Sequence, residues 1–160
     1  MSSIRLKVLL DSTYLLPSFG VEIDGLSDRD ITRLRNAAIK GEIKLYCLTT
    51  VWVEVIGKVC REAERSRIDL GGLLDVAVRA LLESRFYEWI TPTLGTIKLA
   101  FKLRILGHKD NIDNLLYAAS IKEGMILLTM DEDLKRFLSS HGYKTENLMD
   151  HLQLLRKIEA

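Results

Sequence analysis

The chain has 160 residues, 48% of them hydrophobic, which suits one globular domain over residues 1–160 with a substantial core. It has only two prolines, ten glycines and no low-complexity stretch, which excludes an intrinsically disordered chain. The formal net charge of +1 lacks the strong basic excess of proteins that coat duplex nucleic acid, so any contact with nucleic acid would come from local patches.

The cysteine count and the N-terminus favour a reducing compartment. Cys47 and Cys60 are too few for a disulfide framework in a chain of this length, and we expect both to be small buried thiols. The start MSSIRLKVLLD lacks the apolar segment of a signal peptide, and no run of residues approaches the length of a membrane span. We therefore expect a cytoplasmic protein with no membrane partner.

The first half of the chain alternates strands with helices. Residues 4–10 form an apolar run that predicts a buried strand ending at Asp11. Ser27 and Asp30 have the spacing of a capping box, with Asp in place of the usual Glu or Gln, and predict a helix start. The expected elements are a strand at 4–10, an irregular stretch at 14–26, a helix at 28–40 ended by Gly41, a strand at 42–48, a helix from 51 onward capped by Thr49 or Thr50, and an amphipathic helix at 69–83.

The second half continues this alternation. Its expected elements are a strand at 86–90, a helix from Thr93 to near Gly107, a helix at 111–123, a buried strand at 125–129, a helix at 131–139, a weak strand at 143–145 and a last helix through Leu148, Leu152, Leu155 and Ile158. Such alternation predicts an α/β fold, a three-layer sandwich around a mainly parallel sheet of about five strands.

Four acidic residues lie where this fold would bring them to one edge of the sheet. Asp11 directly follows the first strand, and Asp131 lies two residues beyond the strand at 125–129. Glu54 lies in the first turns of the helix after the second strand, and Asp113 begins the helix before the 125–129 strand. Because ligands in parallel sheets bind beyond the carboxyl ends of the strands, we expect the four carboxylates to meet there.

Each acid also has a purely structural interpretation. Asp11 suits a turn, and Asp113 suits a helix cap. Asp131 or Asp133 could likewise cap the helix that follows. Glu54 is harder to explain in this way, because it lies among valines and a tryptophan, where a carboxylate without a partner is costly. Gathered together, the acids would repel one another unless a hard cation such as Mg²⁺ or Mn²⁺ neutralised them.

Four short motifs resemble those of the PIN-domain nucleases. The segments are VLLDST at 8–13, VWVEVIGKV at 51–59, DNLLYAAS at 113–120 and LLTMDEDL at 127–134. They are similar, in that order, to the family's strand-end motif with its first metal-binding aspartate, the helix that supplies its glutamate, its Asp-x-Leu-Ile-Tyr-Ala pattern and its Thr-x-Asp-x-Asp-Phe pattern. Their order and spacing cover residues 8–134, most of the chain.

The resemblance implies a PIN-like fold and a divalent-metal-dependent endoribonuclease that hydrolyses RNA with Mg²⁺ or Mn²⁺. By motif position the catalytic and metal-binding quartet would be Asp11, Glu54, Asp113 and Asp131. Ser12 and Thr129 would support the site, with Asp133 as an additional acid. Asp110 competes with Asp113 for the third position, since it lies one turn away on the same face. Many small prokaryotic members resemble VapC toxins, so the resemblance also implies an antitoxin whose tail covers the acidic groove, and a homodimer.

Basic residues near these acids could hold the phosphates of a substrate. Lys58 and Arg61 follow the glutamate, and Lys102 and Lys109 approach the third aspartate. Solvated helix faces explain these four residues equally well. His108 lies nearby in sequence, but an exposed loop histidine is the more usual interpretation.

Three other functions compete with a toxin nuclease. A maturation or decay nuclease without an antitoxin would use the same acids, and a degenerate PIN-like scaffold would bind RNA or protein without cutting. A haloacid-dehalogenase-like phosphatase also begins with a strand-end aspartate, but it normally has a second aspartate two residues later, where this chain has Thr13. The apolar stripe at 69–83 could serve a dimer interface, although such stripes more often pack on the core.

Overall fold

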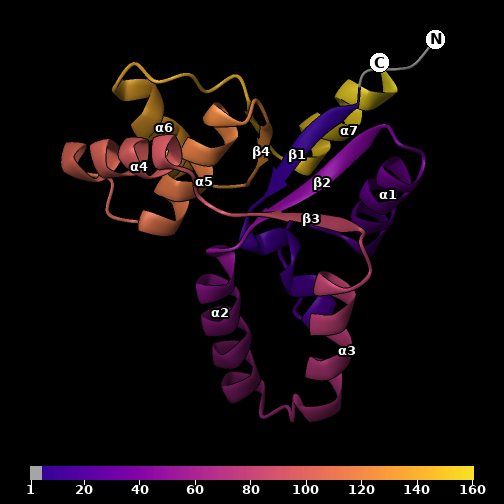
Figure 1. Ribbon diagram of the computed structural model, residues 1–160. Coiled ribbons are helices and arrows are strands. Elements are labelled where there is room, and N and C mark those ends of the chain that lie inside the picture. The colour runs from indigo at the N-terminus through magenta and orange to yellow at the C-terminus, as the bar shows by residue number, and fades with distance from the viewer. Residues whose placement is uncertain (1–4) are drawn as a thin grey trace.

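The computed structural model describes residues 5–160, and at its centre lies a sheet of five strands (Figure 1). The strands are β1 Leu6–Leu10, β2 Ile43–Leu48, β3 Tyr87–Ile90, β4 Ile126–Leu128 and β5 Leu148–Met149. They lie in the order β3-β2-β1-β4-β5, and every neighbouring pair is parallel. The predicted α/β fold is confirmed. Ile4, the first residue of the predicted first strand, lies outside the described residues.

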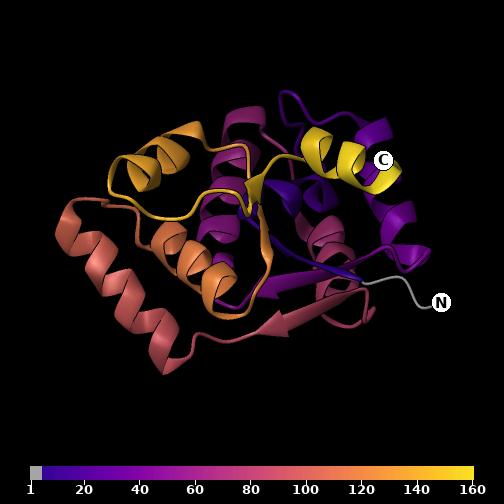
Figure 2. The same cartoon turned by 90° about the horizontal axis from the view of Figure 1, so that it is seen from above.

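Helices cover both faces of this sheet and make it the middle of three layers (Figures 1 and 2). The helices are α1 Asp28–Ile39, α2 Val51–Ser66, α3 Gly71–Leu82, α4 Leu94–Leu106, α5 Asn111–Lys122, α6 Glu132–Ser140 and α7 His151–Glu159, with short 3₁₀ turns η1 Ser12–Tyr14 and η2 Leu16–Phe19. α4, α5 and α6 lie on one face, and α1 and α7 on the other (Figure 2). α2 and α3 extend side by side beyond the sheet (Figure 1).

Each face of the sheet has its own hydrophobic core. Val8 and Leu10 of β1 join the core under α1 and α7, whereas Leu9 joins the core under α4, α5 and α6. All three side chains are buried. A strand buried on both faces needs apolar residues at successive positions, which explains the uninterrupted run VLL in the sequence.

The C-terminal region differs from its prediction. Residues 143–145 form no strand, and β5 lies instead at Leu148–Met149, where it pairs with β4. The last helix accordingly begins at His151, after the cap Asp150, and Leu152 is 43% exposed. The predicted stripe was wrong because Leu148 is buried as part of the sheet and not as part of a helix face.

Other predicted details are confirmed in part. Ser27 and Asp30 form the predicted capping box of α1. Thr50 occupies the N-cap position of α2, but its side chain makes no capping hydrogen bond. The stretch at 14–26, predicted as irregular, contains the short turn η2. Both cysteines are free thiols, and burial raises the pKa of Cys47, but the predicted burial of Cys60 was wrong because it lies on the exposed side of α2.

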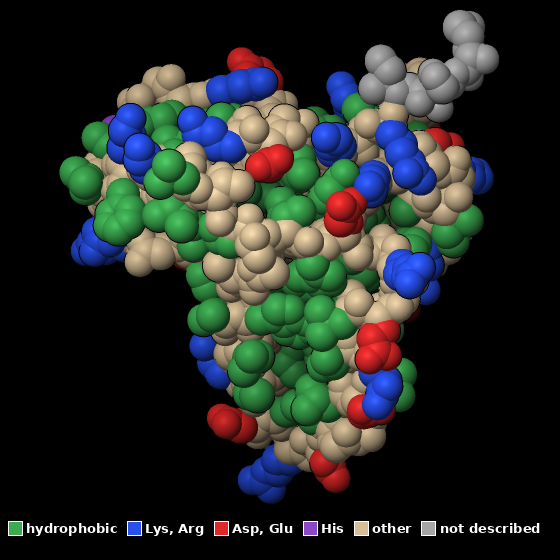
Figure 3. All heavy atoms as spheres, viewed as in Figure 1, with side chains coloured by type: hydrophobic (Ala, Val, Ile, Leu, Met, Phe, Trp, Pro, Cys, Tyr) green, Lys and Arg blue, Asp and Glu red, His purple; other side chains and the backbone are tan. Residues whose placement is uncertain are grey.

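The α3 helix is less buried than its sequence pattern suggests. Ala77 and Leu81 are buried, whereas Leu74 and Val76 are 43% and 65% exposed. Between α2 and α3 lies an apolar hollow of about 460 Å³, the α2–α3 hollow, visible in Figure 3. It is lined by Phe19, Trp52, Val55, Ile56, Val59, Cys60, Leu74, Val78 and Leu82. Within residues 5–160, no helix combines the length and the apolar character needed to cross a membrane.

Candidate functional site

The order of the strands determines where the candidate site lies. From β1 the chain builds β2 and β3 to one side, whereas β4 and β5 lie on the other side of β1. The carboxyl ends of β1 and β4 therefore border the topological switch point, where α/β sheets usually bind ligands. Leu10 pairs with Leu128, so the next residues, Asp11 and Thr129, begin at neighbouring strand ends.

Asp11 is a buried carboxylate at the end of β1, only 8% exposed. Its backbone N–H donates to Leu128 O at 3.2 Å, which fixes it to the end of β4, and its Oδ1 accepts a hydrogen bond from the Thr13 N–H at 3.0 Å. Burial raises the pKa of Asp11 to about 6, against the opposing effects of a hydrogen bond with Thr129 and the charge of Lys58. A bound cation would favour the ionised form of Asp11 further.

Glu54 projects from the first turn of α2 toward the same space, and two neighbours hold it. Ser12, which is fully buried, donates a hydrogen bond from its hydroxyl to Glu54 Oε1. The Lys58 ammonium lies 3.2 Å from the same carboxylate oxygen and 3.0 Å from Ser12 Oγ. The Glu54 side chain is 17% exposed, so the apolar surroundings expected from the sequence are offset by a serine and a lysine.

The α5 helix begins with two acids that both face the site. Asp110 is the N-cap of α5, and its Oδ1 accepts a hydrogen bond from the Asp113 N–H at 3.0 Å. Burial raises the pKa of Asp113 to about 9, helped by the charge of Asp110 and by a hydrogen bond with Asp131. The predicted choice between Asp110 and Asp113 is therefore not exclusive, because the cap and the first turn of α5 bring both carboxylates to one place.

Asp131 and Thr129 complete the opposite side of the site. Thr129 ends β4 and is 7% exposed, and its hydroxyl accepts a hydrogen bond from the Asp131 N–H at 3.1 Å. Asp131 is the N-cap of α6, with Oδ1 accepting from the Leu134 N–H at 3.0 Å. Asp131 thus performs the capping role that was its structural interpretation, and its second oxygen is left for the site.

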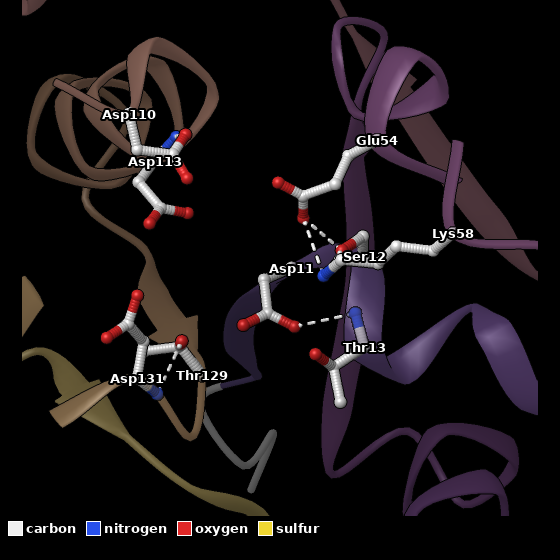
Figure 4. Close-up of polar contacts among 9 residues, drawn as sticks. All are labelled: Asp11, Ser12, Thr13, Glu54, Lys58, Asp110, Asp113, Thr129 and Asp131. Carbon is white, nitrogen blue, oxygen red and sulfur yellow. Dashed lines mark hydrogen bonds and ion pairs between the residues drawn. The ribbon is translucent and has the colours of Figure 1, made fainter. Parts of the chain in front are cut away.

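The carboxylates of Asp11, Glu54, Asp113 and Asp131 converge on one space (Figure 4). One oxygen from each of Glu54, Asp110 and Asp113 lies within 4.8 Å of the others. Ligand oxygens on opposite sides of a Mg²⁺ ion are about 4.2 Å apart, so small side-chain rotations would let one ion contact all three. The donors are all hard carboxylate oxygens, and two of the acids have raised pKa values. The residues present therefore fit Mg²⁺ or Mn²⁺.

Other predicted site residues lie outside this convergence. Asp133 is on the exposed side of α6, where its carboxylate pairs with Arg136 and is 85% exposed. Arg61, Lys102 and Lys109 are exposed on helices and loops around the site, and none of them contacts the acids through a recorded ion pair within residues 5–160. Of the four predicted basic residues, only Lys58 is joined to the cluster.

A buried amide that was not predicted from the sequence fixes the acids of α5. Asn114 is 0% exposed, its Nδ2 donates to His108 O at 2.8 Å, and its Oδ1 lies 2.7 Å from His108 Nδ1. This pair ties the loop from α4 to the first turn of α5 and so sets the positions of Asp110 and Asp113. A polar residue in the otherwise apolar run after Asp113 was the available signal. His108 is half-buried and structural.

Comparison with known proteins bears on the fold. No protein-family model matches this chain, and no curated protein matches it either. The chain is similar to the crystal structure of PAE2754 from Pyrobaculum aerophilum, with a TM-score of 0.63 and 15% sequence identity, over 96% of this chain and 90% of that one. At this identity the likeness establishes a shared fold over nearly the whole chain and nothing about activity.

Proposed function

We propose that this protein is a divalent-metal-dependent endoribonuclease of the PIN-domain kind, a hydrolase that cuts RNA phosphodiester bonds. The observation that carries the proposal is the convergence of carboxylates from separate segments, the ends of β1 and β4 and the starts of α2 and α5, at the switch point of a parallel sheet. Capping explains Asp11, Asp110 and Asp131 singly, but it does not explain Glu54 or why the remaining oxygens face one another.

Asp11, Glu54, Asp113 and Asp131 would hold the metal, with Asp110 as a further ligand in place of, or beside, Asp113. Bound Mg²⁺ or Mn²⁺ would supply Lewis-acid polarisation of the phosphate and lower the pKa of water, chemistry that no side chain of the cluster offers by itself. Because a metal adds positive charge next to Asp11 and Asp113, its binding would lower both of their raised pKa values and release protons.

The chain itself contributes positioning and charge. Asp11, buried at the end of β1 and fixed to the end of β4, would present its carboxylate to the metal from the centre of the sheet edge. Lys58 Nζ, 3.2 Å from Glu54 Oε1, is placed to offset the negative charge of an incoming phosphate. Ser12 and Thr129 hold their neighbouring acids in place through hydrogen bonds and take no part in bond breaking.

The proposed substrate is RNA that is single-stranded at the cut. The net charge of +1 gives no general attraction to a duplex, so phosphates on either side of the cut would rely on local basic residues. Arg61 on α2, Lys102 on α4 and Lys109 before α5 are exposed and available for this role.

The proposed partners are a second copy of the chain and an antitoxin. The α2–α3 hollow supports the homodimer, since Leu74 and Ile56 beside it are 43% and 60% exposed and would be buried by a second copy. An antitoxin would act by laying its tail over the acidic site. The proposed place of action is the cytoplasm.

Cleavage of short single-stranded RNAs with Mn²⁺ tests the proposed activity, with wild type compared against Asp11→Asn. Asparagine keeps an oxygen that can accept from the Thr13 N–H but removes the charge. We expect cleavage by the wild type and a loss of at least about a hundredfold in the variant, typical of removing one electrostatic group from such a site. Equal cleavage by both proteins, or none by either across varied RNAs, would reject the nuclease.

Two alternatives make different predictions for the same protein. A decay or maturation nuclease would cleave RNA but have no neighbouring gene for a small DNA-binding partner. A scaffold that only binds would shift RNA in a gel but would give no cleavage product with any divalent metal. The acids favour cleavage, because a binding scaffold gains nothing from a cluster whose carboxylates repel one another.

A further inference from the structure

The α4 helix is apolar on two opposite sides. Its inner side packs on α5 through Ala100 and Leu103, which are 9% and 0% exposed. Its outer side carries the outer α4 stripe, which consists of Leu94, Ile97, Phe101 and Ile105 at 72%, 43%, 65% and 80% exposure. A surface helix ordinarily places polar residues opposite its buried face. The fold of the single chain therefore does not account for the outer α4 stripe.

The spacing of this stripe is that of a helix-packing surface. Its members recur at intervals of three or four residues, so they form one continuous ridge along the roughly 20 Å of α4. Isolated exposed apolar residues are common on protein surfaces, but a contiguous row of large ones usually marks a binding site. The stripe also lies apart from the acidic site, which is built from α2, α5 and the ends of β1 and β4.

The charged residues of α4 itself all have one sign. Between Glu88 and Asp110 the sequence has no acidic residue, while Lys98, Lys102 and Arg104 flank the stripe on α4. Figure 3 shows basic and apolar side chains together over this part of the molecule. The whole chain has a net charge of only +1, so this segment is strongly basic against a balanced background.

This charge pattern helps to distinguish three possible binding partners for the stripe: a second copy of the chain, RNA, and a helix of another protein. Two copies of α4 packed together would bring lysines and arginines alongside one another with no acid to compensate them. RNA phosphates could pair with the basic residues beside the stripe. Three of the four stripe residues are aliphatic, however, and offer nucleobases no surface for stacking. An amphipathic helix with apolar anchors and acidic flanks satisfies both the ridge and the charges.

We propose that the outer α4 stripe is the docking surface for an acidic amphipathic helix of a partner protein. The partner's apolar residues would pack along Leu94, Ile97, Phe101 and Ile105. Its Asp or Glu residues would pair with the lysines and the arginine that flank the stripe. The α2–α3 hollow is not an equivalent surface, because α3 presents both signs of charge, with Arg79 bridging Asp75 and Glu83. The proposed surface shares Lys102 with the proposed RNA contacts, but its test does not depend on RNA cleavage.

A pair of synthetic peptides tests the proposal against the full-length protein. Both are helical peptides of about 18 residues with leucines at i, i+4, i+7 and i+11; one has glutamates beside the leucines and the other has lysines. Binding of each fluorescein-labelled peptide is measured by fluorescence anisotropy. We expect the glutamate peptide to bind at least about tenfold more tightly at low salt, and this advantage to shrink as salt is added.

Matched variants locate the binding site. Phe101→Ser removes a stripe residue that is 65% exposed, and Val76→Ser removes an equally exposed apolar residue of α3. We expect Phe101→Ser to lower the affinity for the glutamate peptide by about tenfold or more and Val76→Ser to leave it unchanged. Unchanged thermal unfolding of both variants excludes misfolding as the cause, since both positions are on the surface.

Four results would overturn the proposal. These are equal binding of the two peptides, no binding of either, binding that Phe101→Ser does not weaken, and a wild-type dimer in sedimentation that Phe101→Ser separates. The last result would mean that a second copy covers the stripe. An oligouridine that binds the wild type and not Phe101→Ser, with no binding of the glutamate peptide, would assign the stripe to RNA instead.

Discussion

Among the carboxyl groups of residues 5–160, Asp11 and Asp113 are the two whose surroundings in the free protein clearly oppose the charged form. Burial raises the pKa of Asp11 to about 6 and of Asp113 to about 9, and neighbouring acids contribute to both shifts. For Asp11, against an ordinary value of 3.8, this corresponds to about 3 kcal/mol of destabilisation when the group is ionised. A cation at the site would favour the charged forms of both groups, so metal binding should be coupled to the release of protons.

The stability of the metal-free protein should fall as pH rises. Because the folded pKa values lie above the ordinary ones, the folded state binds more protons between about pH 4 and pH 9, so stability is highest below this range and declines through it. Thermal unfolding with a chelator should show this decline, and Asp113→Asn should lose much of it. Asp133→Asn, whose carboxylate is 85% exposed, should keep it; a flat profile for wild type would contradict the assignment.

Lys58 should compete with the metal for Glu54. Its ammonium already neutralises the carboxylate at 3.2 Å, so Lys58→Met should tighten Mn²⁺ binding by about fivefold, the effect of removing one such charge pair. Arg61→Met is the matched control, since it removes one positive charge from the next turn of α2 without a recorded contact to the cluster. Calorimetric titration with Mn²⁺ measures both; equal effects would show that only net charge matters.

At the scale of elements, helix starts hold the acids in position. Asp110 caps α5 and Asp131 caps α6, so each uses one oxygen on its own helix and directs the rest of its carboxylate at the site. A sequence cannot distinguish a cap that serves only the helix from one that also serves a site, because both require Asp at the same position. Only the convergence of several helix starts at one sheet edge separates the two.

Asn114 should matter for the start of α5 although it does not face the metal. Asn114→Ala removes its hydrogen bonds to His108 and leaves a partly buried carbonyl without this partner, so we expect a loss of about 2 kcal/mol in the free energy of unfolding. We also expect weaker Mn²⁺ binding, since Asp110 and Asp113 lose their fixed positions. Asn111→Ala, at an exposed position of the same turn, is the control, and urea unfolding with Mn²⁺ titration measures both effects.

Most elements were predictable, and the exceptions have physical causes. The capping box at Ser27, the helix at 28–40 and the apolar run of β1 carry local signals that the structure follows. The two-residue strand β5 does not, because its identity depends on pairing with β4 and not on its own residues. Similarly, the roles of Asn114 and Lys58 depend on residues outside their own helices: Asn114 bonds to His108 in the loop before α5, and Lys58 bonds to Ser12 after β1.

At the scale of the whole molecule, strand order explains the site and leaves two surfaces unexplained. Alternating elements predicted the parallel sheet, but they could not give the order β3-β2-β1-β4-β5, which places β1 beside β4 and so opens the crevice at Asp11. The exposure of α3 and of the outer α4 stripe was also not predictable, since a helical apolar pattern does not say which side the rest of the chain will cover.

The α2–α3 hollow should be the surface that pairs two copies of the chain. Leu74→Glu places a charge at its edge and should convert a dimer to a monomer in sedimentation equilibrium, because a buried unpaired charge opposes association. Ile39→Glu, at a residue of α1 that is 68% exposed, should leave the dimer intact. A monomeric wild type, or a dimer unaffected by Leu74→Glu, would reject this interface.

The most direct test of the metal site is calorimetric Mn²⁺ binding to Asp131→Asn and Asp133→Asn beside the wild type. The two positions lie at the start of α6, the charge change is the same, and asparagine preserves the cap at 131. We expect wild type and Asp133→Asn to bind Mn²⁺ alike and Asp131→Asn to bind it at least about tenfold more weakly. Equal affinity for all three proteins, or no binding by the wild type, would contradict the proposed metal site.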